Sequence, residues 1–130
     1  MTSMKNTLIV LSITLAVALG VYAQHSHNSK ETNKDVTVIG EVIDPVCYLS
    51  HGSLGKEHQA CAEYCVKQGI PLGILEDKTG KIYMSLPADH TNPNAKRKDF
   101  IADKVKVTGT VYSEGGLTGI HVKAVERASQ

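Results

Sequence analysis

The sequence contains no tryptophan and only one phenylalanine among its 130 residues. A core without large aromatic rings must be filled by valine, isoleucine and leucine, and β-branched residues favour strands. The chain also has no surplus of charge. One of its 14 Lys and Arg residues lies in the first 23 positions, so the remainder holds 13 of them against 13 Asp and Glu. Nucleic-acid binders and membrane-surface proteins need a basic field, so we expect neither function.

Motifs of several enzyme classes are missing as well. The chain has no phosphate-binding glycine loop, no Gly-x-Ser-x-Gly and no His-Glu-x-x-His, which removes the usual signatures of nucleotide-binding enzymes, hydrolases and zinc proteases. It has no Cys-x-x-Cys-His, so covalent c-type haem is not supported. These absences favour a non-enzymatic role.

The first 23 residues have the pattern of a secretory signal peptide. Lys5 precedes an apolar run over residues 8–20, and Val21-Tyr22-Ala23 predicts cleavage before Gln24. The apolar run spans about 13 residues, fewer than the roughly 18 to 20 that cross a bilayer. We therefore predict a periplasmic or secreted protein without a membrane anchor after cleavage.

The remaining chain divides into a leader and one domain. Residues 24–35 are polar and lack hydrophobic anchors, which indicates a flexible segment. Residues 36–130 are long enough for a single domain with a modest core.

Five segments of this domain are typical of strands, and two are typical of helices. The predicted strands are 36–43, 70–76, 81–86, 104–112 and 117–125, and the predicted helices are 55–68 and 93–103. Gly40 and Gly109 each stand inside a predicted strand, where glycine usually marks a bulge or a sharp bend.

This order of elements resembles that of the OB-fold, a small Greek-key barrel of five strands. The chain is also similar to small exported bacterial OB-like proteins that share a pattern of cysteine, histidine and glycine residues. The matching residues here are Asp44, Cys47, Tyr48, His58, Cys61, Cys65, Gly69, Pro71 and Gly73. The resemblance implies a mainly β, five-stranded OB-like barrel, with a helical insertion between strands one and two and a short helix between strands three and four.

All three cysteines fall within nineteen residues, together with a histidine that matches their spacing. On a helix over 55–68, His58, Cys61 and Cys65 project from one face that spans roughly 100°. Cys47 follows the first strand, and the loop between them lets the helix fold back onto it. A set of thiolates and an imidazole suits Zn²⁺, Cu⁺ or an iron site, so Cys47, His58, Cys61 and Cys65 are predicted metal ligands. His51 is an alternative ligand.

Two other interpretations of the cysteines remain open. Outside the cytoplasm thiols tend to oxidise, so Cys47 can form a disulfide with one helix cysteine and staple a structural or protein-interaction domain. Alternatively, Cys61 and Cys65 form a thiol-redox pair on one helix. The sequence does not identify the protein or small-ligand partner in any of these cases.

Overall fold

The computed structural model describes residues 34–129. The predicted signal peptide and nearly all of the predicted leader therefore lie outside the described residues. Within them the fold is mainly β, as predicted. The strands are β1 (Asp35–Ile43), β2 (Gly73–Glu76), β3 (Ile82–Leu86), β4 (Lys104–Glu114) and β5 (Leu117–Arg127), and the helices are α2 (Pro45–His51) and α3 (Gln59–Lys67), with 3₁₀ turns η2 (Lys56–His58) and η3 (Lys98–Phe100).

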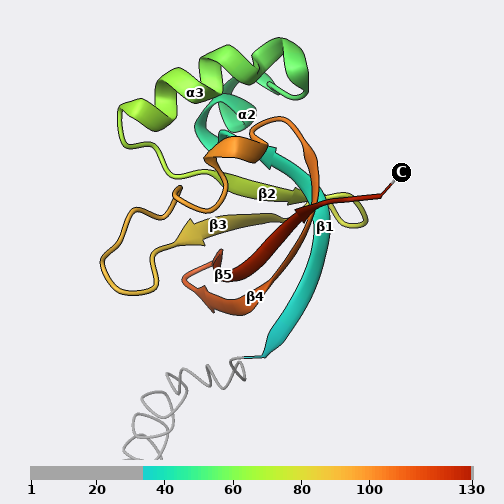
Figure 1. Cartoon of the computed structure of the whole chain (residues 1–130), viewed down its shortest axis with the longest axis vertical. Coiled ribbons are helices and arrows are strands. Elements are labelled where there is room, and N and C mark those ends of the chain that lie inside the picture. The colour runs from blue at the N-terminus through green and yellow to red at the C-terminus, as the bar shows by residue number, and fades with distance from the viewer. Residues whose placement is uncertain (1–33, 130) are drawn as a thin grey trace, which may run out of the picture. The chain divides into compact units, whose positions relative to one another are not determined.

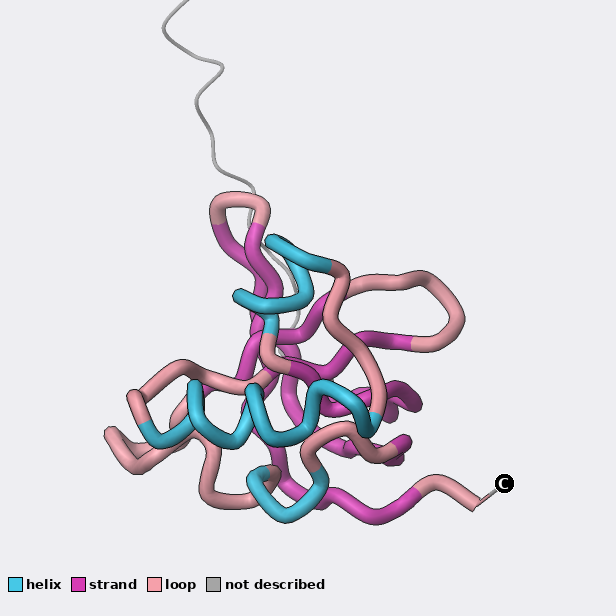
Figure 2. Tube along the Cα trace, turned by 90° about the horizontal axis from the view of Figure 1, so that it is seen from above, coloured by secondary structure: helices cyan, strands magenta, loops and turns pink. Residues whose placement is uncertain are grey.

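The five strands form one sheet that closes on itself in the order β1-β2-β3-β5-β4. Strands β3 and β5 run parallel, while the other neighbours are antiparallel. Both α-helices lie in the connection between β1 and β2 and cover one end of the sheet (Figure 1). The tube view from above shows α3 as the long helix outside the strands (Figure 2). The predicted five strands and the helical insertion after β1 are confirmed.

The interior of the sheet is aliphatic, as the shortage of aromatic residues predicted. In β4 buried and exposed residues alternate at first, so that Val105 and Val107 point inward. The side chains that are almost completely buried are Val38, Val42, Leu72, Ile74, Val105, Val107 and Ile120. Tyr83 and Phe100 pack against this cluster while remaining partly exposed. The hydrophobic effect is thus carried mainly by valine, isoleucine and leucine.

The strand glycines Gly40 and Gly109 permit a close approach of another backbone. A Cβ atom at Gly40 would lie 2.0 Å from the carbonyl oxygen of Leu75, and one at Gly109 would lie 2.2 Å from that of His121. The pairing of β4 with β5 shifts register between Thr108 and Gly109, where Lys123 of β5 has no partner. The predicted irregularity therefore lies beside Gly109, with the extra residue on β5.

The predicted short helix over 93–103 is present only as a 3₁₀ turn. This segment consists of turns and the short η3. The side chain of Asn94 is buried; it accepts a hydrogen bond from the Leu72 amide (2.8 Å) and donates one to the Ile70 carbonyl (2.9 Å). These long-range contacts fix the turn against the segment that follows α3, which local helix signals do not reveal.

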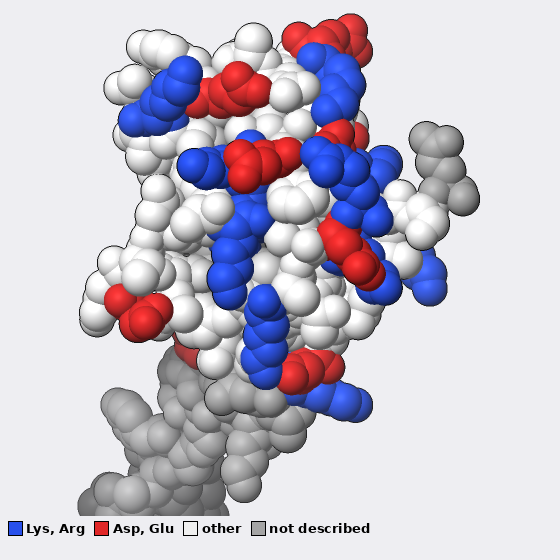
Figure 3. All heavy atoms as spheres, in the orientation of Figure 1, with Lys and Arg blue, Asp and Glu red and all other residues white. Residues whose placement is uncertain are grey.

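Charged side chains of both signs are interspersed on the face drawn in Figure 3, with no large area of one sign. This mixture matches the balanced composition. In the described part of the chain, no helix is both long and apolar enough to cross a membrane.

Candidate metal centre

Cys47 lies on a helix that the sequence analysis did not predict. Asp44 has extended backbone angles (φ −83°, ψ 107°), and its Oδ1 accepts hydrogen bonds from the amides of Val46 (2.8 Å) and Cys47 (3.2 Å). Pro45 occupies the first turn and Gly52 ends the helix in the left-handed region (φ 68°). Aspartate as the N-cap, proline behind it and glycine at the end are ordinary helix signals.

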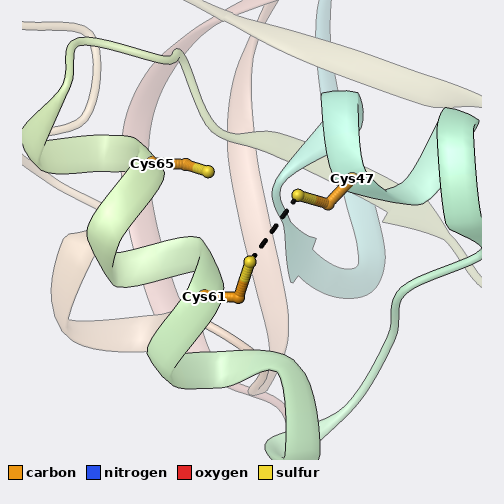
Figure 4. A group of neighbouring side chains, drawn as sticks. All are labelled: Cys47, Cys61 and Cys65. Carbon is orange, nitrogen blue, oxygen red and sulfur yellow. Dashed lines mark hydrogen bonds between the residues drawn. The ribbon is translucent and has the colours of Figure 1, made fainter.

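The second helix, α3, carries the other two cysteines. Ala62 is buried in the core and Val66 packs against it, so these residues attach the helix to the sheet. Cys61 and Cys65 project from another side of α3, toward the Cys47 side chain on α2 (Figure 4). The predicted helix over 55–68 is therefore confirmed in η2 and α3, and its fold-back onto Cys47 is confirmed as well.

The three thiols converge on one point. The Sγ atoms of Cys47 and Cys61 are 3.8 Å apart, and the Sγ atoms of all three cysteines lie within 4.8 Å of one another. Cys61 is exposed and the other two are half-buried. All three are free thiols, so the predicted disulfide is not formed in this structure.

These separations are close to those of thiolates on a shared metal ion. With a metal–sulfur bond of about 2.3 Å, sulfurs at the corners of a tetrahedron are about 3.8 Å apart, and sulfurs in a planar trigonal arrangement about 4.0 Å. The Cys47–Cys61 separation already has this value, and the widest pair would close by less than about 1 Å. Three soft donors in this arrangement have the geometry of a cation site.

A buried carboxylate borders the thiols. Asp44 is only 4% exposed, and while its Oδ1 caps α2, its Oδ2 has no hydrogen-bond partner among the described residues. Burial opposes ionisation of this carboxyl, but the neighbouring Cys65 and Cys47 thiols and the capping amides outweigh it and lower the Asp44 pKa. Asp44 is therefore an anion at neutral pH.

The same carboxylate disfavours ionisation of two thiols. The pKa of Cys47 is raised to about 12, first by Asp44, then by burial and by Cys61. The pKa of Cys65 is also raised, and Asp44 is again the largest cause. Without a cation, Cys47 and Cys65 are thus neutral thiols beside a negative charge.

The two histidines that were predicted as ligands lie apart from the three converging sulfurs. His58 is exposed at the start of α3 and is not a member of the cysteine group. It lines the same shallow, solvent-open cleft as Asp44, Cys47 and Cys61. His51 is exposed at the end of α2. The structure thus brings together three of the four predicted ligands.

Asp44 is the site residue that the sequence analysis missed. It was recognised in the shared pattern, but no role was assigned to it. Its sequence signal was the N-cap position before Pro45, which places a carboxylate three residues from Cys47 and at the base of the same helix. No family of proteins, curated protein or solved structure that we compared with the chain matches it.

Proposed function

We propose that this protein is an exported, non-enzymatic module that binds a soft or borderline transition-metal ion through Cys47, Cys61 and Cys65. The observation that carries this proposal is the convergence of the three Sγ atoms within 4.8 Å. Thiolates select Cu⁺ and Zn²⁺ among the available ions and also bind iron. The partner that delivers or receives the ion is a protein or a small ligand of the extracytoplasmic space.

The electrostatics of the cluster support a cation as its natural occupant. Asp44 keeps a buried oxygen without a hydrogen-bond partner in residues 34–129, beside two thiols whose ionisation it opposes. A bound cation would offset the carboxylate and the thiolates together, because opposite charge at short range favours the ionised forms. Metal binding would therefore release the thiol protons.

The same electrostatics argue against the thiol-redox alternative. A reactive cysteine needs a lowered pKa and an electropositive setting, whereas Asp44 raises the pKa values of Cys47 and Cys65. The Cys61–Cys65 pair also lies along one helix, where the side chains are poorly directed for a disulfide.

A disulfide staple is the second candidate function of the cysteines. The 3.8 Å separation of the Cys47 and Cys61 sulfurs favours it over any other pairing, because a small movement of α2 toward α3 would bring the two sulfurs to bonding distance. In that case the cysteines would only hold the helices together, and Cys65 would remain free.

The wider context of this proposal is an OB-like barrel. The closed order β1-β2-β3-β5-β4 and the helical insertion between β1 and β2 support that description. The connection between the first two strands of OB-folds contributes to their binding face, and here it carries all three thiols. Export rests on the signal-peptide pattern of residues 1–23.

Native mass spectrometry of the mature protein, purified from a periplasm and loaded with Zn²⁺ or Cu⁺, tests the proposal. We expect one ion per chain, and loss of that ion in Cys47→Ser, Cys61→Ser and Cys65→Ser. His51→Ala is the matched control on α2 and should keep the ion. His58→Ala shows whether that histidine supplies a further donor.

Stability gives a second measurement. A free metal concentration 100 times the Kd would add about 2.7 kcal/mol, which raises the Tm of a domain of this size by roughly 10–20 °C. A metal-free protein with a disulfide between Cys47 and Cys61, unchanged by added Zn²⁺ or Cu⁺, would overturn the metal proposal and establish the staple instead.

A further inference from the structure

A second site is indicated by an arginine in the connection between β3 and β4. Arg97 is 2% exposed, and its Nε has no hydrogen-bond partner in the part of the chain that the structure describes. Arg97 belongs to none of the ion pairs found among residues 34–129. In those pairs Lys56 and Arg127 bind Asp103, and three further lysines bind acids on or beside the strands. A buried guanidinium without an acidic neighbour is uncommon, because desolvation of a charge is costly.

The pKa of Arg97 reflects the absence of a nearby carboxylate among the described residues. Burial lowers the pKa of Arg97 to about 10, and no carboxylate opposes this change. Even so, the side chain remains protonated at neutral pH. The protein therefore holds a permanent positive charge in a desolvated position, and an oxyanion would stabilise it by charge-assisted hydrogen bonds.

The surroundings of Arg97 form a receptive hollow. It is open to solvent and is lined by Arg97 together with Lys96, Thr91 and Asn92, while Leu86 and Val122 supply apolar walls. Lys96 is exposed and its Nζ donates to the Val122 carbonyl (3.2 Å), which holds a second cation at the same hollow. None of these residues lines the cleft beside the cysteines.

The backbone around Arg97 is fixed in place. The amides of Arg97 and Lys98 donate to the Asn94 carbonyl (2.9 and 3.0 Å), and the Asn94 side chain is anchored to the segment between α3 and β2. A guanidinium on a fixed turn loses little entropy when it binds a ligand, and its planar fork of donors fits carboxylate and phosphate oxygens.

We propose that this hollow binds a small oxyanion, a phosphate or a carboxylate, through the Arg97 guanidinium with Lys96 at the rim. The site shares no residue with the cysteine cluster and does not depend on the metal binding proposed there. An anion here would order the connection between β3 and β4 and stabilise the folded chain.

Titrations of the mature protein with sodium phosphate and with sodium acetate, each at constant ionic strength against sodium chloride, test this proposal. In ¹H–¹⁵N spectra of the wild-type protein we expect a saturable shift of the Arg97 Nε–H resonance with one of the two anions and none with chloride. The Tm should rise by several degrees at saturation. The identity of the effective anion distinguishes a phosphate site from a carboxylate site.

Two variants complete the test. Arg97→Met replaces the guanidinium by an apolar side chain and should abolish the rise in Tm, whereas Lys98→Met removes a neighbouring exposed cation and should leave it unchanged. If phosphate and acetate shift the Arg97 resonance no more than chloride does, the proposal is overturned, and the buried guanidinium is satisfied by water. This result is read on the wild-type protein, so it stands even where Arg97→Met does not fold.

Discussion

Replacing Asp44 by asparagine should make Cys47 more reactive in the metal-free protein. Asparagine keeps an oxygen that can cap α2, so the helix and the position of its cysteine are preserved. It removes the carboxylate, whose hydrogen bonding with the Cys47 thiol is the largest cause of the raised Cys47 pKa and whose charge raises that pKa further. The sign follows directly: without the anion the thiolate is less disfavoured, and the Cys47 pKa falls.

The size of the effect is bounded by the structure. The Cys47 pKa lies at about 12 against an ordinary value of 9.0, but burial and Cys61 contribute to that difference and remain in the variant. A decrease of about one to two pKa units is therefore expected, which raises the thiolate fraction roughly ten- to a hundredfold. Because a less basic thiolate is also a weaker nucleophile, the alkylation rate should rise by only about three- to tenfold.

The assay is alkylation by iodoacetamide at pH 8 in the presence of a metal chelator, followed by peptide mass spectrometry of the segment with Cys47. The circular dichroism spectra of wild type and Asp44→Asn should coincide, which separates the charge effect from a loss of structure. Asp44→Ala is the comparison that also removes the cap, and it should lower stability by about 1 kcal/mol. An Asp44→Asn protein that folds normally but alkylates at Cys47 no faster than wild type would refute the reasoning.

Three further predictions concern stability. Gly40→Ala should cost at least about 2 kcal/mol, because its Cβ would lie 2.0 Å from the Leu75 carbonyl oxygen; urea unfolding measures this, and an unchanged midpoint would contradict it. Ile74→Ala should cost about 2–5 kcal/mol in the same assay, since Ile74 is fully buried. Lys56 and Arg127 lower the pKa of Asp103 in the folded protein. The stability that the Asp103 carboxylate contributes is therefore fully present above its unfolded pKa of about 3.9. It is lost as the pH falls through the lower pKa of the folded state. Asp103→Asn should lower the free energy of unfolding at pH 7 by up to about 1 kcal/mol and weaken its decline in acid; an identical pH profile in both proteins would contradict this.

The sequence by itself determined the elements whose signals are local. Strand positions followed from β-branched residues and alternation, and the turn glycines separated the last two strands. The helix around Cys61 and Cys65 was delimited by Gly55 before it and Gly69 after it. These features depend on neighbours within a few residues, and so they can be inferred without the fold.

Tertiary structure decided which residues meet. The Asn94 side chain binds backbone groups more than twenty residues away, and its segment forms turns and the short η3 where a helix over 93–103 was predicted. The close pass of Leu75 across Gly40 depends on the register of β1 and β2. Such contacts join segments that are distant in the chain, and no local pattern encodes them.

The cysteine cluster also depends partly on local sequence and partly on tertiary packing. Spacing placed Cys61 and Cys65 on adjacent turns of one helix, but only the packing of α2 against α3 placed the Cys47 sulfur within 4.8 Å of both. The same packing left His58 outside the group of sulfurs and put the Asp44 carboxylate beside them. The sequence therefore specified the donor types, while the choice of donors and the charge around them came from the way the two helices meet.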